Sequence, residues 1–378
     1  MLKVAIVGCG KIADEHAALI KRIPGSEIVG VCDREPLMGK QLADRFPVKR
    51  CYSDLQDLLS DSKPDVVHIT TPPQSHFSLA KLCLESGSNV YVEKPFTVYE
   101  HEARTLIATA NKKGLKITAG HDMQFCHAAR RMRSIVQSGY LGEGPVHMDS
   151  YFCYPLGKSA YAGALLGDKK HWVRSLPGKL LQNIISHGIA RIAEFMRSES
   201  PQVIVHGFTS PLLESLGETE IVDEVRVIIA AEDRTTAYFT FSSQMRPALH
   251  QFRIYGTKNG LILDQDQETV IRVPGEMMVS YLEKFVPPVK TAKQYLGNVG
   301  ANLRKFLARD FHMKAGRNFL IEGFYDSITK GTEPPIPYRE ILLTAKIMDL
   351  IFGQLAPQSH SRPDSGEGMP LASSISNS

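Results

Sequence analysis

A short glycine pattern near the start of the chain has the composition and spacing of a phosphate-binding turn. An apolar run at 2–7 leads into GCGKIA at 8–13, which has the spacing G-x-G-x-x-A, and residues of helical character follow. A second apolar run at 28–32 ends at Asp33, about twenty residues further on. Strand, glycines, helix, strand and acid in this order indicate a dinucleotide-binding site.

Each position of this turn has a physical role. Gly8 permits the tight turn, and Gly10 lets the backbone approach a pyrophosphate. Ala13 keeps the helix close to the strand. The pyrophosphate is expected on the free N–H groups and positive dipole end of the helix that Lys11 and Ile12 open.

Asp33 and Arg34, at the end of the second apolar run, bear on the choice of dinucleotide. The Asp33 carboxylate is placed to accept hydrogen bonds from the adenosine ribose hydroxyls. It would repel the 2′-phosphate of NADP, whereas the adjacent Arg34 would attract that phosphate. NAD is therefore the expected cofactor, with a mild preference, and NADP remains an alternative.

The elements that must position these residues alternate between strands and helices. Further strands are predicted at 65–70, 89–92 and 116–119, with helices at 36–46, 54–59, 75–85 and 101–113 between them. This rhythm predicts a doubly wound parallel sheet over 1–120. Ligands bind beyond the carboxyl ends of such strands, and the residues placed there are Thr71, Pro72, His76, Glu93 and Lys94.

From about residue 121 the pattern changes. Helices are expected at 127–138 and 179–196, and several strand-like runs follow one another: 146–154, 202–208, 220–230, 235–241, 249–255, 261–263 and 270–273. This pattern predicts a second α/β domain over 121–355 with a largely antiparallel open sheet. Helices at 319–329 and 338–352 close it, and the Ser/Pro/Gly-rich tail at 356–378 is expected to be disordered.

The motifs together resemble the Gfo/Idh/MocA oxidoreductases. The matching residues are the glycine turn with His16 and Asp33, the segment TPPQSH at 71–76, and Glu93-Lys94-Pro95. The resemblance implies a Rossmann domain followed by a domain whose open sheet receives the substrate and often mediates oligomerisation. It also implies NAD(P)-dependent oxidation or reduction of a secondary alcohol on a sugar, inositol or nucleotide sugar, and a cis Lys94–Pro95 peptide.

The family's second signature, Asp-x-x-x-His, matches here at Asn183 and His187. The spacing of four places both side chains on one helix face, but asparagine cannot take a proton at neutral pH. The resemblance leaves Lys94 and His187 as the titratable catalytic candidates, with Asn183 positioning the substrate. Gln124 and Trp172 complete the expected substrate contacts, and Trp172 is either a core residue or part of a lid.

In this interpretation His187 accepts the hydroxyl proton during oxidation, and Lys94 stabilises the developing alkoxide. Two alternatives stay open. One is a glycosidase or lyase that uses tightly held NAD for transient oxidation. The other is a dinucleotide-binding sensor without catalysis, an alternative that remains because Asn183 stands where the family has an aspartate.

Bulk composition excludes several classes. A net charge of +4 over 378 residues does not call for a nucleic-acid partner. No cluster has metal-ligand spacing, so we expect no metal. The six cysteines lack a C-x-x-C pair and most lie in apolar runs, which is typical of a reducing compartment. The sequence also begins with a core strand, and we therefore expect the protein in the cytoplasm. A homodimer or homotetramer acting on a small sugar-like molecule is expected.

The stretch 275–318 reads as a basic helical insertion. Its Leu296, Val299, Leu303 and Phe306 form an apolar stripe at helical spacing. The simpler interpretation, which we adopt, packs this stripe on the second domain with the lysines in water. The less favoured alternative is contact with an anion, either a nucleotide-sugar diphosphate or an acidic membrane surface.

Overall fold

The computed structural model describes residues 1–153, 155–156, 167–276, 279–311 and 314–355, so the tail expected to be disordered lies outside the described residues. The first sheet is parallel and has the order β3-β2-β1-β4-β5-β6, which confirms the doubly wound prediction. Its strands are β1 (Leu2–Val7), β2 (Ser26–Cys32), β3 (Cys51–Tyr52), β4 (Val66–Ile69), β5 (Asn89–Val92) and β6 (Ile117–Ala119). The helices between them are α1 (Lys11–Ile20), α2 (Pro36–Arg45), α3 (Leu55–Ser62), α4 (His76–Glu85) and α5 (Glu100–Lys113).

The second sheet has the order β13-β12-β11-β7-β10-β9-β8. Its strands are β7 (Pro145–Cys153), β8 (Gln202–Phe208), β9 (Glu224–Ala230), β10 (Thr236–Ser242), β11 (Leu249–Gly256), β12 (Asn259–Asp264) and β13 (Thr269–Pro274). All neighbouring pairs are antiparallel except β7 and β10, which run parallel. The predicted open and largely antiparallel sheet is therefore confirmed.

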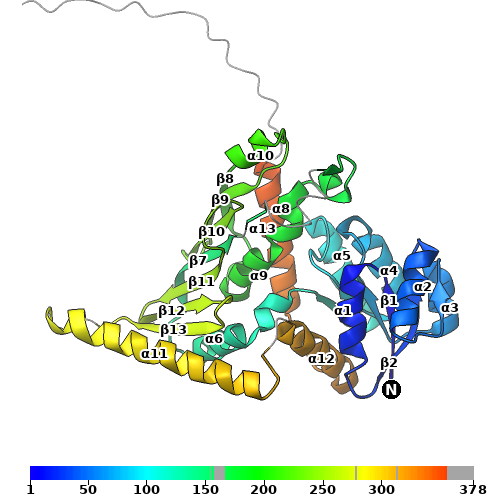
Figure 1. Ribbon diagram of the computed structural model, residues 1–378, viewed down its shortest axis with the longest axis horizontal. Helices are drawn as coiled ribbons and strands as arrows, with labels where there is room; N and C mark the ends of the chain where they lie inside the picture. Colours follow the sequence, from blue (N-terminus) through cyan, green and yellow to red (C-terminus); the bar gives the residue numbers. More distant parts are fainter. Residues whose placement is uncertain (154, 157–166, 277–278, 312–313, 356–378) are drawn as a thin grey trace, which may run out of the picture.

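One face of the second sheet is covered by helices. Figure 1 shows α8, α9 and α13 between this sheet and the parallel-sheet domain. They and α6 contribute apolar side chains to the core of the second sheet. The bounds are α6 (His127–Gln137), α8 (Lys179–Ile184), α9 (Ser186–Phe195), the short α10 (Pro211–Ser215) and α13 (Tyr338–Leu355).

Helix α12 (Ala315–Lys330) returns from the second half of the chain to the first. Its Leu320, Ile321, Phe324 and Tyr325 are buried in the same core as the parallel sheet, although they fall within the range 121–355. This return of the chain brings Arg317, near the start of α12, to 2.9 Å from Asp122 in the segment after β6.

Helix α11 (Leu282–Leu307) lies along β13, at the edge of the second sheet (Figure 1). The expectation that its apolar stripe packs on the second domain is wrong, because Leu296, Val299, Leu303 and Phe306 are 56% to 72% exposed. An edge strand presents unpaired backbone N–H and C=O groups, and polar side chains satisfy these groups where apolar ones cannot. The face of α11 turned to the strand is accordingly polar.

Amide side chains spaced four residues apart make this contact. Gln294 accepts from the N–H of Arg272 at 2.8 Å and donates to its carbonyl at 3.0 Å. Asn298 bonds the N–H and the carbonyl of Val270 in the same way, both at 3.2 Å. Asn302 donates to the Gln267 carbonyl at 3.0 Å. The amides thus continue the hydrogen bonding of the sheet into the helix.

Candidate functional site

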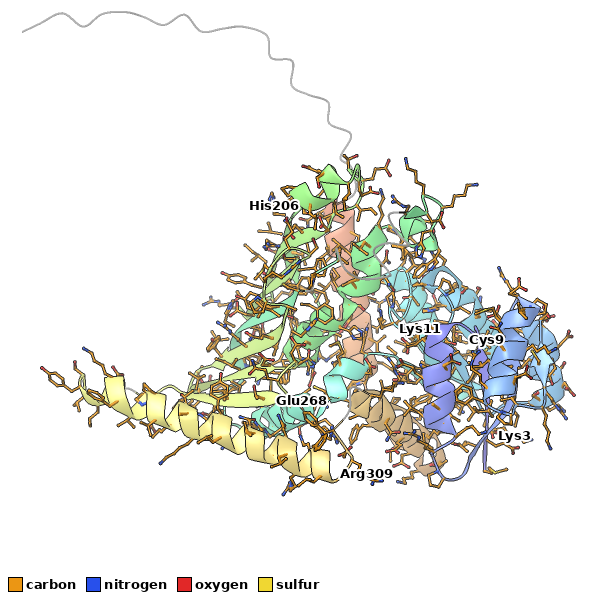
Figure 2. The ribbon with its side chains drawn as sticks, viewed as in Figure 1. Lys3, Cys9, Lys11, His206, Glu268 and Arg309 are labelled. Atoms are coloured by element: carbon orange, nitrogen blue, oxygen red, sulfur yellow. The ribbon has the colours of Figure 1, made fainter. Side chains whose placement is uncertain are left out.

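The glycine turn lies between β1 and α1, as the spacing predicts. Gly8 has φ +90°, and a Cβ there would lie 2.6 Å from Cγ2 of Thr71, so only glycine fits without displacement. Gly10 precedes α1, and a Cβ there would meet no atom within 4 Å. The backbone therefore opens at Gly10 beside the helix N-terminus, where Figure 2 labels Cys9 and Lys11. This cradle fits a pyrophosphate.

Asp33 follows β2 and fixes the turn from its far side. One carboxylate oxygen accepts from the Cys9 N–H at 2.6 Å, and the other accepts from the Glu35 N–H at 2.9 Å. Each oxygen keeps lone-pair capacity for a ribose hydroxyl. Burial, followed by the Asp33 charge, raises the pKa of the Cys9 thiol to about 12, so Cys9 is a small packing residue rather than a reactive thiolate.

A cavity of about 840 Å³ opens beside this turn. Among the predicted residues, Gly8, Gly10, Asp33, Arg34, Thr71, Pro72 and Trp172 line it. Trp172 belongs to a short 3₁₀ helix, η3 (Trp172–Ser175), that the second half of the chain lays against the first. Gln74, which also lines the cavity, donates to the Trp172 carbonyl at 2.7 Å and to the Ser175 hydroxyl at 2.9 Å.

His76 supports the cavity wall from behind. It is fully buried, and its two ring nitrogens lie 2.9 Å from the carbonyl oxygens of Thr71 and Pro95. The ring thereby joins the loop after β4 to the loop after β5. Its side chain is used by these backbone groups and does not line the cavity.

Lys94 follows β5 and reaches across to the second half of the chain. The Lys94–Pro95 peptide is cis, as expected. The Lys94 ammonium donates to the backbone carbonyl of Asn183 at 2.9 Å. Burial lowers the pKa of Lys94, although the charges of Glu93 and Asp122 oppose this shift.

Asn183 and His187 stand on two short helices rather than one. The single helix predicted over 179–196 is interrupted at Ile185, where α8 ends and α9 begins. The break leaves the Asn183 carbonyl as the acceptor for Lys94, and His187 lies in the first turn of α9. The two residues still flank the same junction.

The His187 imidazole is packed against His121 and Phe152, with ring centroids 6.0 and 5.8 Å away. Its Nδ1 is buried and, within the described residues, has no hydrogen-bond partner. Burial, then the Lys94 and His121 charges, lower the pKa of His187 well below the ordinary histidine value. The ring is therefore neutral at pH 7, and in the Nε2–H tautomer Nδ1 has a lone pair ready to accept a proton.

A chain of buried hydrogen bonds holds Glu93. His16 Nε2 lies 2.9 Å from the Glu93 carboxylate, the Nδ1 atoms of His16 and His68 are 2.8 Å apart, and His68 Nε2 lies 2.8 Å from the Tyr325 hydroxyl. Neutral rings satisfy all three bonds only if Tyr325 donates to His68, His68 to His16, and His16 to Glu93. Burial raises the pKa of Glu93, but His16, Arg317 and Lys94 more than offset this and hold the pKa below its usual range. Glu93 is therefore a carboxylate beside Lys94.

With this geometry established, comparisons place the chain among known proteins. Residues 2–121 match the model of an oxidoreductase family with an NAD-binding Rossmann fold, and residues 129–262 match the GFO/IDH/MocA C-terminal domain. The chain belongs to the Gfo/Idh/MocA family. Its first domain is thus a Rossmann domain of the NAD-binding type.

Individual relatives agree with this family. The chain is 33% identical to D-glucoside 3-dehydrogenase of Escherichia coli (strain K12) over 143 residues, which are 38% of this chain and 41% of that protein. The match thus spans less than half of that relative's length. The fold is shared with the scyllo-inositol dehydrogenase from Lactobacillus casei, solved with NAD(H) and scyllo-inositol, at a TM-score of 0.69 and 19% identity over 94% of this chain and 96% of that one. The fold is also shared with the WlbA dehydrogenase from Bordetella pertussis, solved with NADH and UDP-GlcNAcA. The TM-score is 0.73 and the identity 14%, over 93% of this chain and 94% of that one.

In this Gfo/Idh/MocA protein, Gln124 is tied into a separate polar cluster. Its side chain is buried, and its amide nitrogen lies 3.2 Å from Glu194 and 3.4 Å from Glu340. The structure therefore places the Gln124 amide nitrogen with carboxylates of α9 and α13, while its buried Oε1 has no partner among the described residues.

Sequence reasoning missed two residues that shape the electrostatics around Lys94 and His187. Arg317 of α12 lies 2.9 Å from Asp122 and also pairs with Glu15 of α1. His121 has a buried Nε2 without a partner among the described residues, and burial followed by the Lys94 charge lowers its pKa to about 4. Arg317 had no local signal because its partners are two to three hundred residues away, and His121 belongs to none of the sequence motifs described above.

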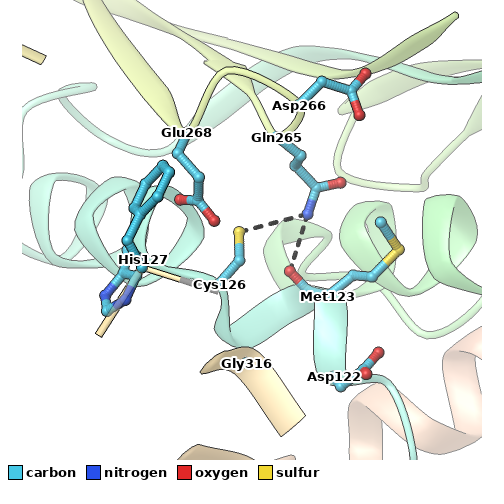
Figure 3. A pocket seen from close by; sticks show the side chains of 9 residues that line it. Asp122, Met123, Cys126, His127, Gln265, Asp266, Glu268 and Gly316 are labelled. Carbon is cyan, nitrogen blue, oxygen red and sulfur yellow. Dashed lines mark hydrogen bonds between the residues drawn. The ribbon is translucent and has the colours of Figure 1, made fainter. Parts of the chain in front are cut away.

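A second cavity, of about 420 Å³, lies under the β12–β13 turn (Figure 3). Gln265 crosses it, donating to the Met123 carbonyl at 2.9 Å and contacting the Cys126 thiol at 3.6 Å. Neither Lys94 nor His187 lines it. It is distinct from the cavity beside the glycine turn.

Proposed function

We propose that this protein is an NAD(P)-dependent dehydrogenase or reductase that transfers a hydride to or from a secondary alcohol of a sugar, an inositol or a nucleotide sugar. The observation that carries the proposal is the bond from Lys94 to the Asn183 carbonyl at the junction of α8 and α9, with the neutral imidazole of His187 in the first turn of α9. D-glucoside 3-dehydrogenase, scyllo-inositol dehydrogenase and the WlbA dehydrogenase support the substrate class.

The cofactor would be held by the glycine turn, the first residues of α1 and Asp33, with Arg34, Thr71 and Pro72 on the cavity wall. When bound, NAD supplies the acceptor or donor of the hydride. His76, whose ring nitrogens face the Thr71 and Pro95 carbonyls and whose single N–H donates to one of them, would support these loops instead of contacting the dinucleotide.

The chain's own residues would handle the proton. In oxidation, His187 accepts the hydroxyl proton on Nδ1, and the Lys94 ammonium donates a hydrogen bond to the oxygen as negative charge develops on it. In reduction, the same imidazole returns the proton. Glu93, held as a carboxylate by His16, stabilises the charged form of Lys94.

Asn183 would orient the substrate, because its side chain donates and accepts hydrogen bonds but does not titrate. Trp172 and Gln74 would close the cavity over the bound molecules, since both line it and the backbone of Trp172 is fixed by Gln74. Gln124 serves the substrate indirectly, through the packing of α9.

The test is a screen for NADH formation with scyllo-inositol, glucosides and UDP-linked amino sugars and uronates, and for the reverse reaction with their keto forms. Turnover of at least one class, lowered about 100-fold or more by His187→Ala, is expected. If NAD binds but no alcohol in the panel is oxidised and no ketone reduced, the proposal is wrong.

Finer points of the proposal concern cofactor, compartment and assembly. NAD should be preferred to NADP because Asp33 is a carboxylate, with exposed Arg34 softening the preference. All six cysteines are free, which suits the reducing cytoplasm.

On the outer face of the second sheet, Ile204, Ile228 and Tyr238 lie opposite one another on neighbouring strands and are exposed. This apolar row suits association of two copies of the chain.

A further inference from the structure

The exposed side of α11 carries a continuous apolar stripe. Leu282, Phe285, Val289, Leu296, Val299, Leu303 and Phe306 recur at intervals of three and four residues, with Ala292 in the one longer gap, and every large member is exposed. Tyr295 and Leu307 widen the stripe beyond the two positions per heptad that a coiled-coil seam uses. Figure 2 shows side chains projecting from this helix away from the body of the protein, with Arg309 just past its end.

The orientation of the stripe is fixed by the opposite face of the helix. Gln294 and Asn298 are hydrogen-bonded to the edge strand and Asn302 to the turn before it, and Arg131 also bonds the Asn298 side chain. Rotating α11 to bury the stripe against the sheet would leave these amides and the backbone groups of the edge unpaired. Each lost hydrogen bond would destabilise the rotated arrangement. The sequence therefore holds the apolar residues outward.

The charges beside the stripe are of one sign. Within α11 five residues are basic and one, Glu283, is acidic; the basic residues are Lys284, Lys290, Lys293, Arg304 and Lys305. On a helical projection Lys290, Lys293 and Arg304 follow one border of the stripe. A wide apolar face bordered by lysine and arginine is the pattern of a helix that lies in the headgroup region of a bilayer.

We propose that α11 binds the surface of a membrane containing anionic lipid. Charge decides the occupant: anionic headgroups complement the basic border, whereas a second copy of α11 packed on the stripe would bring a second Lys290, Lys293 and Arg304 close to the first set. The helix lies on the bilayer and does not cross it, since no helix of the described residues is long and apolar enough to span a membrane. The proposal does not depend on the reaction assigned above.

Vesicle flotation tests the proposal with the full chain. Vesicles of phosphatidylcholine alone and of phosphatidylcholine with phosphatidylglycerol are compared at low and high salt. Binding is expected only with phosphatidylglycerol, and it should weaken at high salt because the attraction of each basic residue to the surface is screened. Absence of binding to the anionic vesicles at low salt overturns the proposal, as does equal binding to neutral vesicles.

Matched variants localise the binding. Leu303→Glu should lower partitioning at least about tenfold, whereas Leu216→Glu, at a leucine of nearly equal exposure (58% against 56%) elsewhere on the surface, should not. Lys293→Glu with Arg304→Glu should lower it by a similar factor, against Lys81→Glu with Lys112→Glu as the control of equal charge change. Vesicle binding that survives Leu303→Glu assigns it to another surface and overturns the proposal.

Sedimentation velocity tests whether a second copy of the chain, instead of a membrane, covers the stripe. If Leu303→Glu converts an oligomer into smaller species and no variant binds vesicles, the stripe is covered by a second copy and the membrane proposal is wrong. If the oligomeric state is unchanged while vesicle binding is lost, the proposal stands. Turnover of the soluble enzyme should be the same in all these variants.

Discussion

The two halves of the candidate site differ in how far along the chain their contacts reach. In the cofactor half, Gly8, Gly10 and Asp33 lie within one β-α-β unit and line an open cavity. In the reaction half, Lys94 bonds a carbonyl 89 residues away, and His68 bonds Tyr325 257 residues away. Local backbone geometry thus suffices for the first, while the second depends on how α8, α9 and α12 pack. Binding and chemistry should therefore be separable by mutation.

The largest separation is expected at the titratable residues. His187→Ala and Lys94→Ala should each lower kcat by about 100-fold or more, because proton transfer and alkoxide stabilisation are both confined to the transition state. The Kd for NADH, measured by fluorescence, should stay near that of the wild type. A parallel loss of cofactor affinity would mean that the two halves are not independent.

The pH dependence of turnover sharpens the same point. A group that accepts a proton must be unprotonated, and burial places the pKa of His187 well below 6.5. Oxidation should therefore hold its rate as pH falls from 7 to 6.5, with the acid limb of kcat below the ordinary histidine range. The control is His187→Ala, in which this limb should disappear. A limb centred at or above pH 6.5 would contradict the assignment.

A glycine pair tests the cofactor half. Gly8→Ala places a Cβ 2.6 Å from Thr71 in a backbone conformation that favours glycine, so the free energy of unfolding should fall by about 1–3 kcal/mol. Gly10→Ala meets nothing within 4 Å, so stability should change by less than about 1 kcal/mol. The Kd for NADH should nevertheless rise at least about tenfold in Gly10→Ala. Thermal unfolding and titration of both variants distinguish folding from binding.

The same contrast explains how far sequence reasoning reached. The spacing of Gly8, Gly10 and Asp33 is a local signal, and it predicted the turn and the cofactor class, while the alternation of strands and helices predicted the parallel sheet. The roles of Arg317 and Tyr325 could not be predicted, because nothing near them in sequence reveals that α12 returns to the first domain. The break at Ile185 was missed because 179–196 retains helical apolar spacing across it.

The insertion shows a second limit. Periodicity located α11 and its apolar stripe, but it could not say which face of the helix meets the protein. That choice is made by Gln294, Asn298 and Asn302, whose spacing of four was the available signal. Amides at this spacing suit an edge strand, whose backbone groups need partners.

A smaller effect is expected from breaking the chain of buried hydrogen bonds that holds Glu93. Tyr325→Phe removes the O–H donor and leaves the buried His68 Nε2 without a partner, which should lower the free energy of unfolding by about 1–3 kcal/mol. Turnover should change less than about tenfold, because Glu93 keeps its bond from His16. Tyr338→Phe is the control, since its hydroxyl makes, within the described part of the chain, only a long 3.3 Å contact with the Ile117 N–H. Equal destabilisation of both variants would argue against a directional chain.

The smallest effect is expected at Asn183, within the reaction half of the site. Its backbone carbonyl, not its side chain, holds Lys94 at 2.9 Å, so Asn183→Ala should leave that contact and kcat nearly intact. Loss of one substrate hydrogen bond, worth about 0.5–1.5 kcal/mol, should instead raise KM by about two- to tenfold. Asn183→Asp keeps the shape and adds a titratable group, so it tests whether the asparagine only positions the substrate. If Asn183→Ala lowered kcat as far as His187→Ala does, the side chain would belong to the proton-transfer machinery and the reaction half would have three essential groups.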